Sequence, residues 1–309
     1  MRYLISRDGK PADNGVYWEI VGEADESLLL ENNHYLPLGF MVNEEVAYYI
    51  HDGSNPFISQ NDLFRRATGL DGDMFEIIDI LNVGHKDIKV HRQALGNYSY
   101  ILEDDQEKGT FKWNFEIPSD GMFYVYCKID SVKSMRVSVK GNTLRTINIA
   151  QPYIFTAGRF DKGELVSFMA DVKAKKGKAV IYVGYLNQEL FEEGYALMAD
   201  ETFVLTKFSE TEIVGNVTAF KDGLLYTSIP CEKRWKVFVD GLETEIQFVD
   251  SCMAAIPLNE GTHKIEFHYY NNSFIIGIII SIISLISFAA LTMLDILIHK
   301  KYSTNNLQT

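Results

Sequence analysis

Residues 274–298 read FIIGIIISIISLISFAALTMLDILI. No charge occurs from Phe274 to Leu294, and a helix over these positions would reach roughly 31 Å, the thickness of the hydrocarbon core of a bilayer. Buried helices of soluble proteins are shorter and seldom apolar on every side. The serines and the threonine inside the stretch do not oppose a membrane span, because a helical hydroxyl can donate to a carbonyl of the preceding turn. The stretch therefore predicts a membrane anchor, with the lipid bilayer as its partner.

Basic residues near the anchor indicate its orientation. Lys300 and Lys301 follow the span directly, whereas Lys264 is the only Lys or Arg in the twenty positions before it. Basic residues favour the cytoplasmic side of a membrane. We therefore expect residues 299–309 to form a cytoplasmic tail and the bulk of the chain to be extracytoplasmic.

The start of the chain conflicts with this orientation. Residues 1–8, MRYLISRD, lack the apolar run of a signal peptide. A single C-terminal span without an export signal would normally leave the large domain in the cytoplasm. The conflict disappears if the chain is the last piece of a longer protein whose earlier helices carry the domain across. We therefore expect a chain that is single-pass in the cell membrane, whose partner is a missing N-terminal multi-span half or another membrane subunit.

The composition before the anchor is that of a folded, acidic protein. The chain has 17 Tyr, 19 Phe and 3 Trp with 23% charged residues, which is ample material for hydrophobic cores. Its formal charge is −13, and because Asp295, Lys300 and Lys301 sum to +1, the part before the anchor carries −14. Such a body repels phosphate backbones, so nucleic acid is excluded as a partner. The same charge opposes binding flat against an anionic leaflet.

The cysteines give two alternatives. Cys127, Cys231 and Cys252 are odd in number and lack metal-ligand spacing. A Cys231–Cys252 bridge requires that the flanking strands pair and bring the two Cα atoms within bonding range. Three buried free thiols are the favoured interpretation.

Short alternating apolar runs separated by turn residues dominate the chain before the anchor. Runs such as TFKWNFEI (residues 110–117) and MFYVYCKI (residues 122–129) predict strands of a two-sheet, jelly-roll-like β-sandwich. The predicted fold class is mainly β. The predicted division is a mixed α/β region at 1–108, the β-sandwich at 109–198, a small all-β module at 199–271, one C-terminal transmembrane helix at 272–298 and the tail at 299–309.

Local patterns predict several elements inside these regions. Residues 55–64, NPFISQNDLF, indicate a turn entering a helix that Ser59 or Asn61 would cap and that Gly69 would end. Residues 189–199 fit either a short helix or a strand. Gly141-Asn142 and Asp240-Gly241, each between alternating runs, predict hairpin turns.

The best local motif for ligand binding is WKVFVDG, which contains Trp235, Asp240 and Gly241. The face of Trp235 would suit stacking against a sugar ring, with Asp240 as a polar contact. The alternative is that Trp235, Val237 and Val239, which share one face by their period of two, are core residues and that Asp240-Gly241 is only a turn.

Catalytic and metal-binding patterns are weak. Glu189, Glu192 and Glu193 offer the paired carboxylates of glycoside hydrolysis, but acids so close together are usually a solvated face. His263 and His268 lack metal-ligand spacing. We therefore predict no catalytic residue, no metal site and no cofactor in this chain.

Five stretches, taken in order, resemble the C-terminal, extracytoplasmic part of the YfhO family of bacterial multi-span membrane proteins. They are RYLISRDG at 2–9, NHYLPLGFMVN at 33–43, NPFISQNDLFRRATG at 55–69, GLLYTSIPCEKRWKVFVDGLETE at 223–245 and LNEGTHKIEFHYY at 258–270, which leads into the anchor. That family is similar to GT-C-type glycosyltransferases that use lipid-linked sugars. The resemblance implies that the catalytic acids belong to an N-terminal multi-span half with no counterpart here, so no catalytic residue carries over, and whether the chain itself is an enzyme stays open.

Three hypotheses about function follow. In the first, the chain is the non-catalytic extracytoplasmic end of a membrane glycosyltransferase and assists glycosylation of a cell-envelope glycan or cell-wall polymer. In the second, it is a free-standing anchored module that binds glycan or protein. In the third, it is a structural protein whose helix packs on partner helices through the small residues Gly277 and Ser281.

Overall fold

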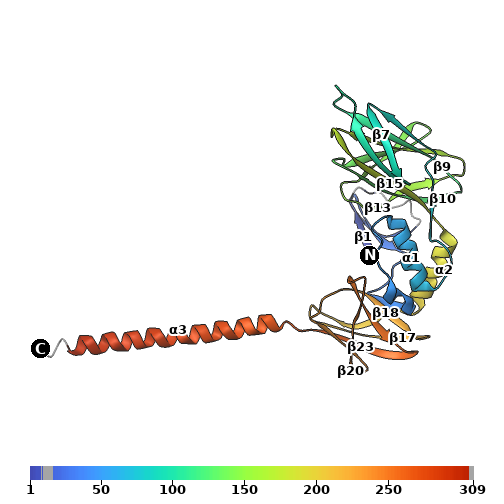
Figure 1. Cartoon of the computed structure of the whole chain (residues 1–309). Helices are drawn as coiled ribbons and strands as arrows, with labels where there is room; N and C mark the ends of the chain where they lie inside the picture. The colour runs from blue at the N-terminus through green and yellow to red at the C-terminus, as the bar shows by residue number, and fades with distance from the viewer. Residues whose placement is uncertain (8, 10–16, 306–309) are drawn as a thin grey trace. The chain divides into compact units, whose positions relative to one another are not determined.

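The computed structural model describes residues 1–7, 9 and 17–305 of the 309-residue chain, with side chains described as far as Leu297. About 51% of the structure is strand, in five sheets. One long apolar helix lies at the C-terminal end (Figure 1). The mainly β fold class is therefore confirmed. The chain forms two compact units, Met1–Val204 with Val217–Cys231 and Ile246–His263, and Leu205–Asn216 with Glu232–Glu245 and Lys264–Thr309.

The largest part of the first unit is a β-sandwich of two antiparallel sheets. One sheet has the order β13 (Ile154–Phe160), β10 (Gly121–Ile129), β15 (Lys176–Leu186), β8 (Asn97–Leu102) and β7 (Ile88–Ala94), and β5 (Phe75–Ile78) also pairs with β15. The other has the order β12 (Asn142–Asn148), β11 (Ser134–Val139), β14 (Leu165–Val172), β9 (Gly109–Glu116) and β6 (Asn82–Lys86). The sheets therefore include strands on both sides of residue 108, while the predicted five-part division stays a prediction.

Alternating burial explains why these strands form a sandwich. In β9, Phe111, Trp113 and Phe115 are fully buried, and the residues between them are not. Residues of β10, β14 and β15 join them in one continuous core. Because successive side chains point to opposite faces of a sheet, β9 and β14 bury every second residue.

Three smaller sheets complete the fold. The N-terminal sheet has the order β1 (Tyr3–Ser6), β3 (Ser27–Asn32) and β2 (Trp18–Ala24). A second has the order β21 (Gln247–Val249), β22 (Met253–Leu258), β18 (Gly223–Pro230) and β4 (Gly39–Val42). The third has the order β16 (Val204–Phe208), β17 (Glu212–Ala219), β23 (Gly261–Tyr269), β19 (Trp235–Val239) and β20 (Leu242–Thr244).

Both predicted hairpins form, but the turn of the first lies one residue earlier than predicted: it is Lys140-Gly141, because Asn142 already pairs with Val139. β11 pairs with β12 as far as Val139 and Asn142, and β19 pairs with β20 as far as Val239 and Leu242. In the second hairpin both central turn residues have positive φ, 52° at Asp240 and 84° at Gly241. This backbone matches the twist of the flanking strands, and Asp-Gly adopts it readily.

Helix α1 (Pro56–Thr68) forms where predicted, but its cap was predicted wrongly. The side chain of Asn55, not Ser59 or Asn61, caps the helix by accepting a hydrogen bond from the Phe57 amide. Pro56 sets this start, because a proline at the first helical position has no amide hydrogen to satisfy. Gly69 ends the helix with a φ of 75°, as predicted.

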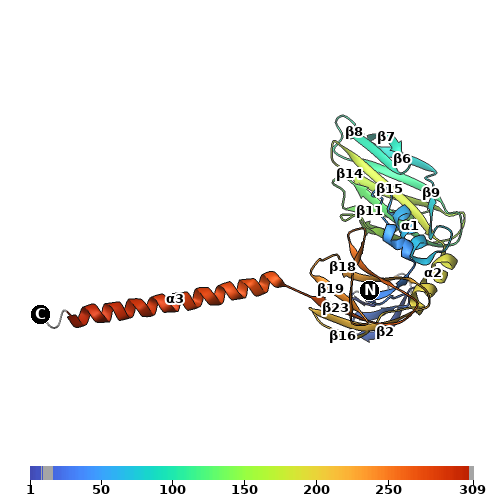
Figure 2. The ribbon, with the colours of Figure 1, turned by 60° about the horizontal axis from the view of Figure 1, so that its bottom comes forward.

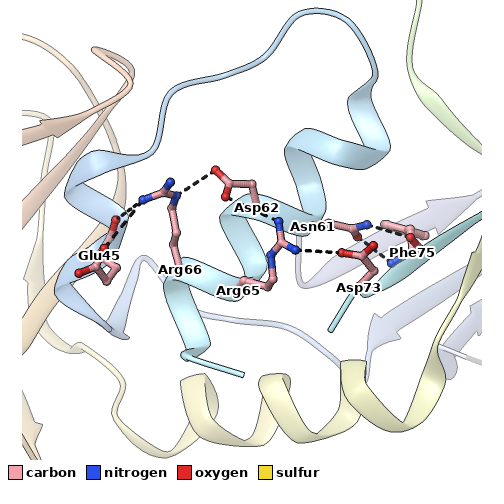
Figure 3. A network of polar contacts seen from close by, with 7 residues as sticks. All are labelled: Glu45, Asn61, Asp62, Arg65, Arg66, Asp73 and Phe75. Carbon is pink, nitrogen blue, oxygen red and sulfur yellow. Dashed lines mark hydrogen bonds and ion pairs between the residues drawn. The ribbon is translucent and has the colours of Figure 1, made fainter. Parts of the chain in front are cut away.

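The side chain of Asn61 instead joins α1 to β5. It donates to the Phe75 carbonyl and accepts from the Phe75 amide, both at 2.8 Å (Figure 3). On the exposed side, Arg66 bonds Asp62 at 2.9 Å and reaches Glu45 of the short 3₁₀ helix η2 (Glu44–Tyr48). These contacts fix α1 against both neighbours.

Helix α1 packs on the outer face of the sandwich, and α2 (Gln188–Asp200) lies beside it (Figures 1 and 2). The ambiguous stretch at 189–199 is therefore helical. Two glycines permit this packing. A Cβ added at Gly184 of β15 would lie 2.8 Å from the ring of Phe57, and one at Gly194 of α2 would lie 2.3 Å from the ring of Phe64.

Helix α3 (Asn272–Asn305) contains the predicted anchor. Within Asn272–Leu297, the most apolar 18-residue window has a mean hydropathy of 2.8, and none of that window is buried. The hydroxyls of Ser281, Ser284 and Ser287 donate to carbonyls four residues earlier, at 2.8 to 2.9 Å. The helix is therefore long and apolar enough to cross a bilayer, with its hydroxyls satisfied internally.

The cysteine prediction is partly wrong. All three thiols are free, but only Cys127 is buried; Cys231 is half-buried and Cys252 is exposed. Cys127 alternates into the sandwich core on β10, whereas the other two lie at strand ends, where fewer side chains cover them.

Candidate functional site

The first unit contains an apolar pocket of about 250 Å³ where α1 and α2 lie over β4 and β18. Its walls are almost entirely hydrocarbon or aromatic. The lining residues are Leu36, Phe40, Val42, Val46, Gln60, Leu63, Phe64, Ala67, Met74, Phe191, Met198 and Tyr226. A concave apolar surface with few polar groups is the usual form of a small-molecule site.

Tyr226 and Gln60 are the polar residues of this lining. The Tyr226 ring lies 5.8 Å from that of Phe40, on the neighbouring strand β4. Burial raises the pKa of the Tyr226 hydroxyl, so it stays protonated at neutral pH and can donate a hydrogen bond. The pocket can therefore hold a largely apolar group, with Tyr226 and Gln60 as the polar residues of its lining.

A group of polar and aromatic side chains lies next to the pocket and shares Phe191 with it. We call this group the His34 cluster; its members are Tyr17, His34, Gln188, Phe191, Glu192 and Tyr195. Four of the six come from one face of α2, where residues three or four apart are neighbours. The other two come from the chain around β2 and β3.

Hydrogen bonds connect four members of the His34 cluster in one chain. The Tyr17 hydroxyl donates to the Gln188 carbonyl oxygen at 2.6 Å, and the Gln188 amide donates to Glu192 Oε1 at 2.5 Å. Glu192 Oε2 lies 2.8 Å from His34 Nε2. The Tyr195 hydroxyl lies 3.2 Å from the Asn33 carbonyl oxygen, so α2 is tied to the segment that carries His34.

The contact with Glu192 indicates which nitrogen of the His34 ring donates. A carboxylate only accepts hydrogen bonds, so the imidazole Nε2 is the donor of this contact. His34 Nδ1 is buried and has no partner among the described residues. A buried polar atom without a hydrogen-bond partner lowers the free energy of unfolding by roughly 1–3 kcal/mol, so the position of this ring destabilises the fold.

The arrangement suits binding better than chemistry. The ring of His34 lies 5.2 Å from that of Phe191 and 4.8 Å from that of Tyr195, which gives aromatic surface beside the polar groups. Glu192 is 46% exposed, so a solvent-side ligand can reach its carboxylate. Among the residues that the structure describes, no group of three or more His, Cys, Asp or Glu could hold a metal ion.

The predicted ligand residues lie elsewhere, in the second unit. Trp235 is half-buried, with its ring edge-on to Phe267 and Tyr269 at 6.2 and 5.1 Å. Val237 on the same face is fully buried. Asp240 is the turn residue, and its carboxylate accepts a hydrogen bond from the Lys264 amide at 2.8 Å. These positions fit the core-and-turn alternative, and their role in ligand binding stays a prediction.

The predicted anchor residues all lie on α3. Phe274 and Leu294 are exposed, as a lipid-facing side chain would be, and Gly277 has open space around its Cα. Lys300 and Lys301 are within the helix, but their side chains lie outside the described part of the structure.

Sequence reasoning did not find the pocket or the His34 cluster. The three acids considered on α2, Glu189, Glu192 and Glu193, are all exposed. Of these, Glu192 contacts His34. The spacing of Gln188, Phe191, Glu192 and Tyr195 on one helix face was the available local signal. Nothing local links this face to His34, which is 158 positions from Glu192.

Several solved structures resemble part of the chain weakly. A family 35 carbohydrate-binding module from Clostridium thermocellum is 14% identical, covers 36% of this chain and 95% of its own, and has a TM-score of 0.26. The C-terminal CBM6 of LamC, a marine laminarinase from Zobellia galactanivorans, is 8% identical, covers 37% and 99%, and has a TM-score of 0.25. The PA14 domain of the antifreeze protein MpAFP is 12% identical, covers 47% and 79%, and has a TM-score of 0.22. Similarities this weak carry no argument about function.

No curated protein matches the chain. The sequence profile of the family described as "Bacterial membrane protein YfhO" matches residues 1–281. That range covers every β-sheet, the pocket, the His34 cluster and the first turns of α3. The resemblance noted in the sequence is thereby confirmed, and the chain belongs to the YfhO family of bacterial membrane proteins.

Proposed function

We propose that this chain is a non-catalytic, extracytoplasmic part of a YfhO-type membrane glycosyltransferase and that it binds an acceptor glycan of the cell envelope. The catalytic carboxylates would belong to another, membrane-embedded part of the enzyme. Helix α3 would hold the glycan-binding part at the membrane surface, where lipid-linked donors are used.

The observation that carries the proposal is the His34 cluster. Sugars present hydroxyl groups that both donate and accept hydrogen bonds, together with apolar C–H faces. Glu192 and Gln188 supply acceptors and a donor, and the rings of His34, Phe191 and Tyr195 supply apolar surface at the same place. This combination is what glycan recognition requires.

Charge narrows the class of glycan. The part of the chain before the anchor carries −14, as derived above, and the exposed group of the His34 cluster is a carboxylate. A polyanionic chain would be repelled, whereas a neutral or amine-bearing sugar would not. We therefore propose a neutral or cationic stretch of acceptor glycan as the ligand.

Glycan binding is tested with the full chain in phosphatidylcholine nanodiscs and chitohexaose, a neutral oligosaccharide of N-acetylglucosamine, by isothermal titration calorimetry. Glu192→Gln should weaken binding about tenfold, since a hydrogen bond to a charged group contributes roughly 1.5 kcal/mol or more. Glu189→Gln, exposed on the same helix, is the matched control and should leave affinity unchanged. Equal loss in both variants, or no binding by the unaltered chain to this probe, would contradict the proposal.

Orientation is tested separately by protease treatment of intact cells that produce the chain with a C-terminal epitope. An extracytoplasmic bulk should be digested while the epitope remains protected and attached to a short membrane fragment. Protection of the whole chain until the cells are broken would place the bulk in the cytoplasm and exclude an extracytoplasmic role.

A further inference from the structure

Two of the three cysteines lie next to each other just beyond the paired ends of two antiparallel strands. In the register of β18 and β22, Pro230 lies opposite Met253. One step further along each strand brings Cys231 opposite Cys252. The Cys231 amide donates to the Cys252 carbonyl oxygen at 2.7 Å, so the pairing continues through the two cysteines.

This register places the two residues within disulfide range. Antiparallel residues that exchange both backbone hydrogen bonds have Cα atoms about 5.5 Å apart, and Cys231 and Cys252 make one of these two bonds. Disulfides join residues whose Cα atoms are about 4.4–6.8 Å apart, and directly opposed side chains leave the sheet on the same face. The condition that the sequence alone left open, pairing of the flanking strands, is therefore met.

The local backbone holds Cys252 in this position. Cys252 closes the turn between β21 and β22, where its amide donates to the Val249 carbonyl oxygen at 2.9 Å. Asp250 and Ser251, the central residues of the turn, have φ values of 50° and 54°. A tight hairpin turn of this kind fixes the register of β21 on β22, and thereby the position of Cys252 at the end of this hairpin.

Both thiols are accessible to reagents, unlike the third. Cys252 is exposed and Cys231 is half-buried. Cys127 is fully buried in the sandwich, and burial raises the pKa of its thiol. Because the thiolate is the reactive form, the chain carries its own unreactive control.

We propose that Cys231 and Cys252 are a disulfide-forming pair that covalently joins the β21–β22 hairpin to the end of β18. The oxidant is a small-molecule disulfide or a thiol–disulfide oxidoreductase. The exposed Cys252 thiolate attacks this disulfide and releases one thiol; the Cys231 thiolate then attacks the mixed disulfide and releases the second. Two thiol protons and two electrons leave the protein, and the oxidant is reduced to two thiols. The bond would fix the strand that carries Tyr226, a wall of the apolar pocket.

The test uses the full chain in nanodiscs, incubated with oxidised glutathione, alkylated with iodoacetamide, digested and analysed by mass spectrometry. We expect a peptide pair linked through Cys231 and Cys252, with Cys127 alkylated only after unfolding. The midpoint of thermal unfolding should rise on oxidation and return on reduction, because the cross-link restricts the unfolded chain.

A variant with one cysteine shifted by one residue tests whether the link depends on the relative position of the two thiols or only on their exposure to the oxidant. In the double variant Cys252→Ser with Met253→Cys, the second thiol moves one residue and points to the opposite face of the strand. This variant should give a glutathione adduct and no intramolecular link. A stable adduct on Cys252 of the unaltered chain with Cys231 still alkylated, or a link that survives the shift, would overturn the proposal. Neither outcome bears on glycan binding.

Discussion

The β-sandwich core and the α1–α2 pocket belong to the same compact unit but are filled very differently. In the sandwich, Phe111 stacks on Trp113 at 4.8 Å and Phe115 meets Phe168 edge-on at 5.4 Å, all four being buried. Over β4 and β18, by contrast, the two helices leave about 250 Å³ between apolar walls.

Geometry accounts for the difference. In two stacked sheets the inward side chains repeat with the same period of two residues, so they interdigitate and pack as densely as the molecules of an organic crystal. The side chains of helices repeat with a different period from those of the strands on which they lie. In addition, the contact of Gly194 with Phe64 sets how closely α2 approaches α1, independently of the strands β4 and β18. The comparison indicates that close packing in the sandwich stabilises the fold and that the unfilled volume of the pocket lowers the stability of the fold.

Truncating a large aromatic side chain should give the largest contrast between the two regions. Phe168→Ala in the sandwich should lower the free energy of unfolding by about 3–5 kcal/mol, because it removes a fully buried ring from a close-packed core. Phe191→Ala in the pocket wall, where the ring is only half-buried, should cost about 1–2 kcal/mol. Urea unfolding of the full chain in detergent, followed by tryptophan fluorescence, measures both. Equal losses would mean that the pocket is as tightly packed as the sandwich.

Enlarging a small side chain should have opposite effects in the two regions. Ala170→Leu on β14 should cost about 1–3 kcal/mol, since the core has no room for three more carbons. Ala67→Leu on α1 points into the pocket and should be neutral or stabilise the chain by up to about 1 kcal/mol. It should also lower binding of the apolar dye N-phenyl-1-naphthylamine, measured by fluorescence in nanodiscs. Undiminished dye binding would show that the dye does not enter this pocket.

Removing a buried hydroxyl compares the sandwich core with the face of β15 on which α1 packs. The Tyr182 hydroxyl accepts from Asn97 at 2.7 Å and donates to the Ser54 carbonyl oxygen at 3.2 Å, so Tyr182→Phe should cost about 1–2 kcal/mol. The Tyr98 hydroxyl is buried in the sandwich with no partner among the described residues. Tyr98→Phe should therefore be neutral or slightly stabilising. A clear loss with Tyr98→Phe would reveal a bound water at that hydroxyl.

The smallest expected effect comes from charged groups at the surface of each region. Burial raises the pKa of Asp171 on β14, but hydrogen bonds from Arg136, Thr110 and Lys108 outweigh it and bring the pKa to about 2. The lowered pKa means that the carboxylate stabilises the fold above about pH 4 and that this stabilisation is lost as the pH falls towards 2.

Asp171→Asn should therefore cost about 1 kcal/mol at pH 7, after allowance for solvent screening, and most of the difference from the unaltered chain should be lost by pH 2. Asp62→Asn, which breaks a more exposed pair with Arg66 on α1, should cost about 0.5 kcal/mol at pH 7. Thermal unfolding between pH 2 and pH 7 measures both variants. An undiminished difference for Asp171→Asn at pH 2 would contradict this assignment.

The sequence by itself determined the features that depend on neighbours along the chain. The uncharged stretch from Phe274 to Leu294 predicted α3 because bilayer thickness sets the length of a span. Alternation predicted the strands of the sandwich, and Asp240-Gly241 predicted a hairpin turn, because both patterns act over a few residues. The family motifs could likewise be recognised in the sequence, in their order along the chain.

Only the tertiary structure decided which distant residues meet. His34 reaches Glu192 because the segment around β3 lies against α2, and Cys231 faces Cys252 because β18 pairs with β22 in one particular register. The same holds for Asn61, which bonds both backbone groups of Phe75, a residue on another element. Local patterns specify elements, but the packing of one element on another depends on side chains far apart in the sequence, and the candidate site and the cysteine pair exist only through that packing.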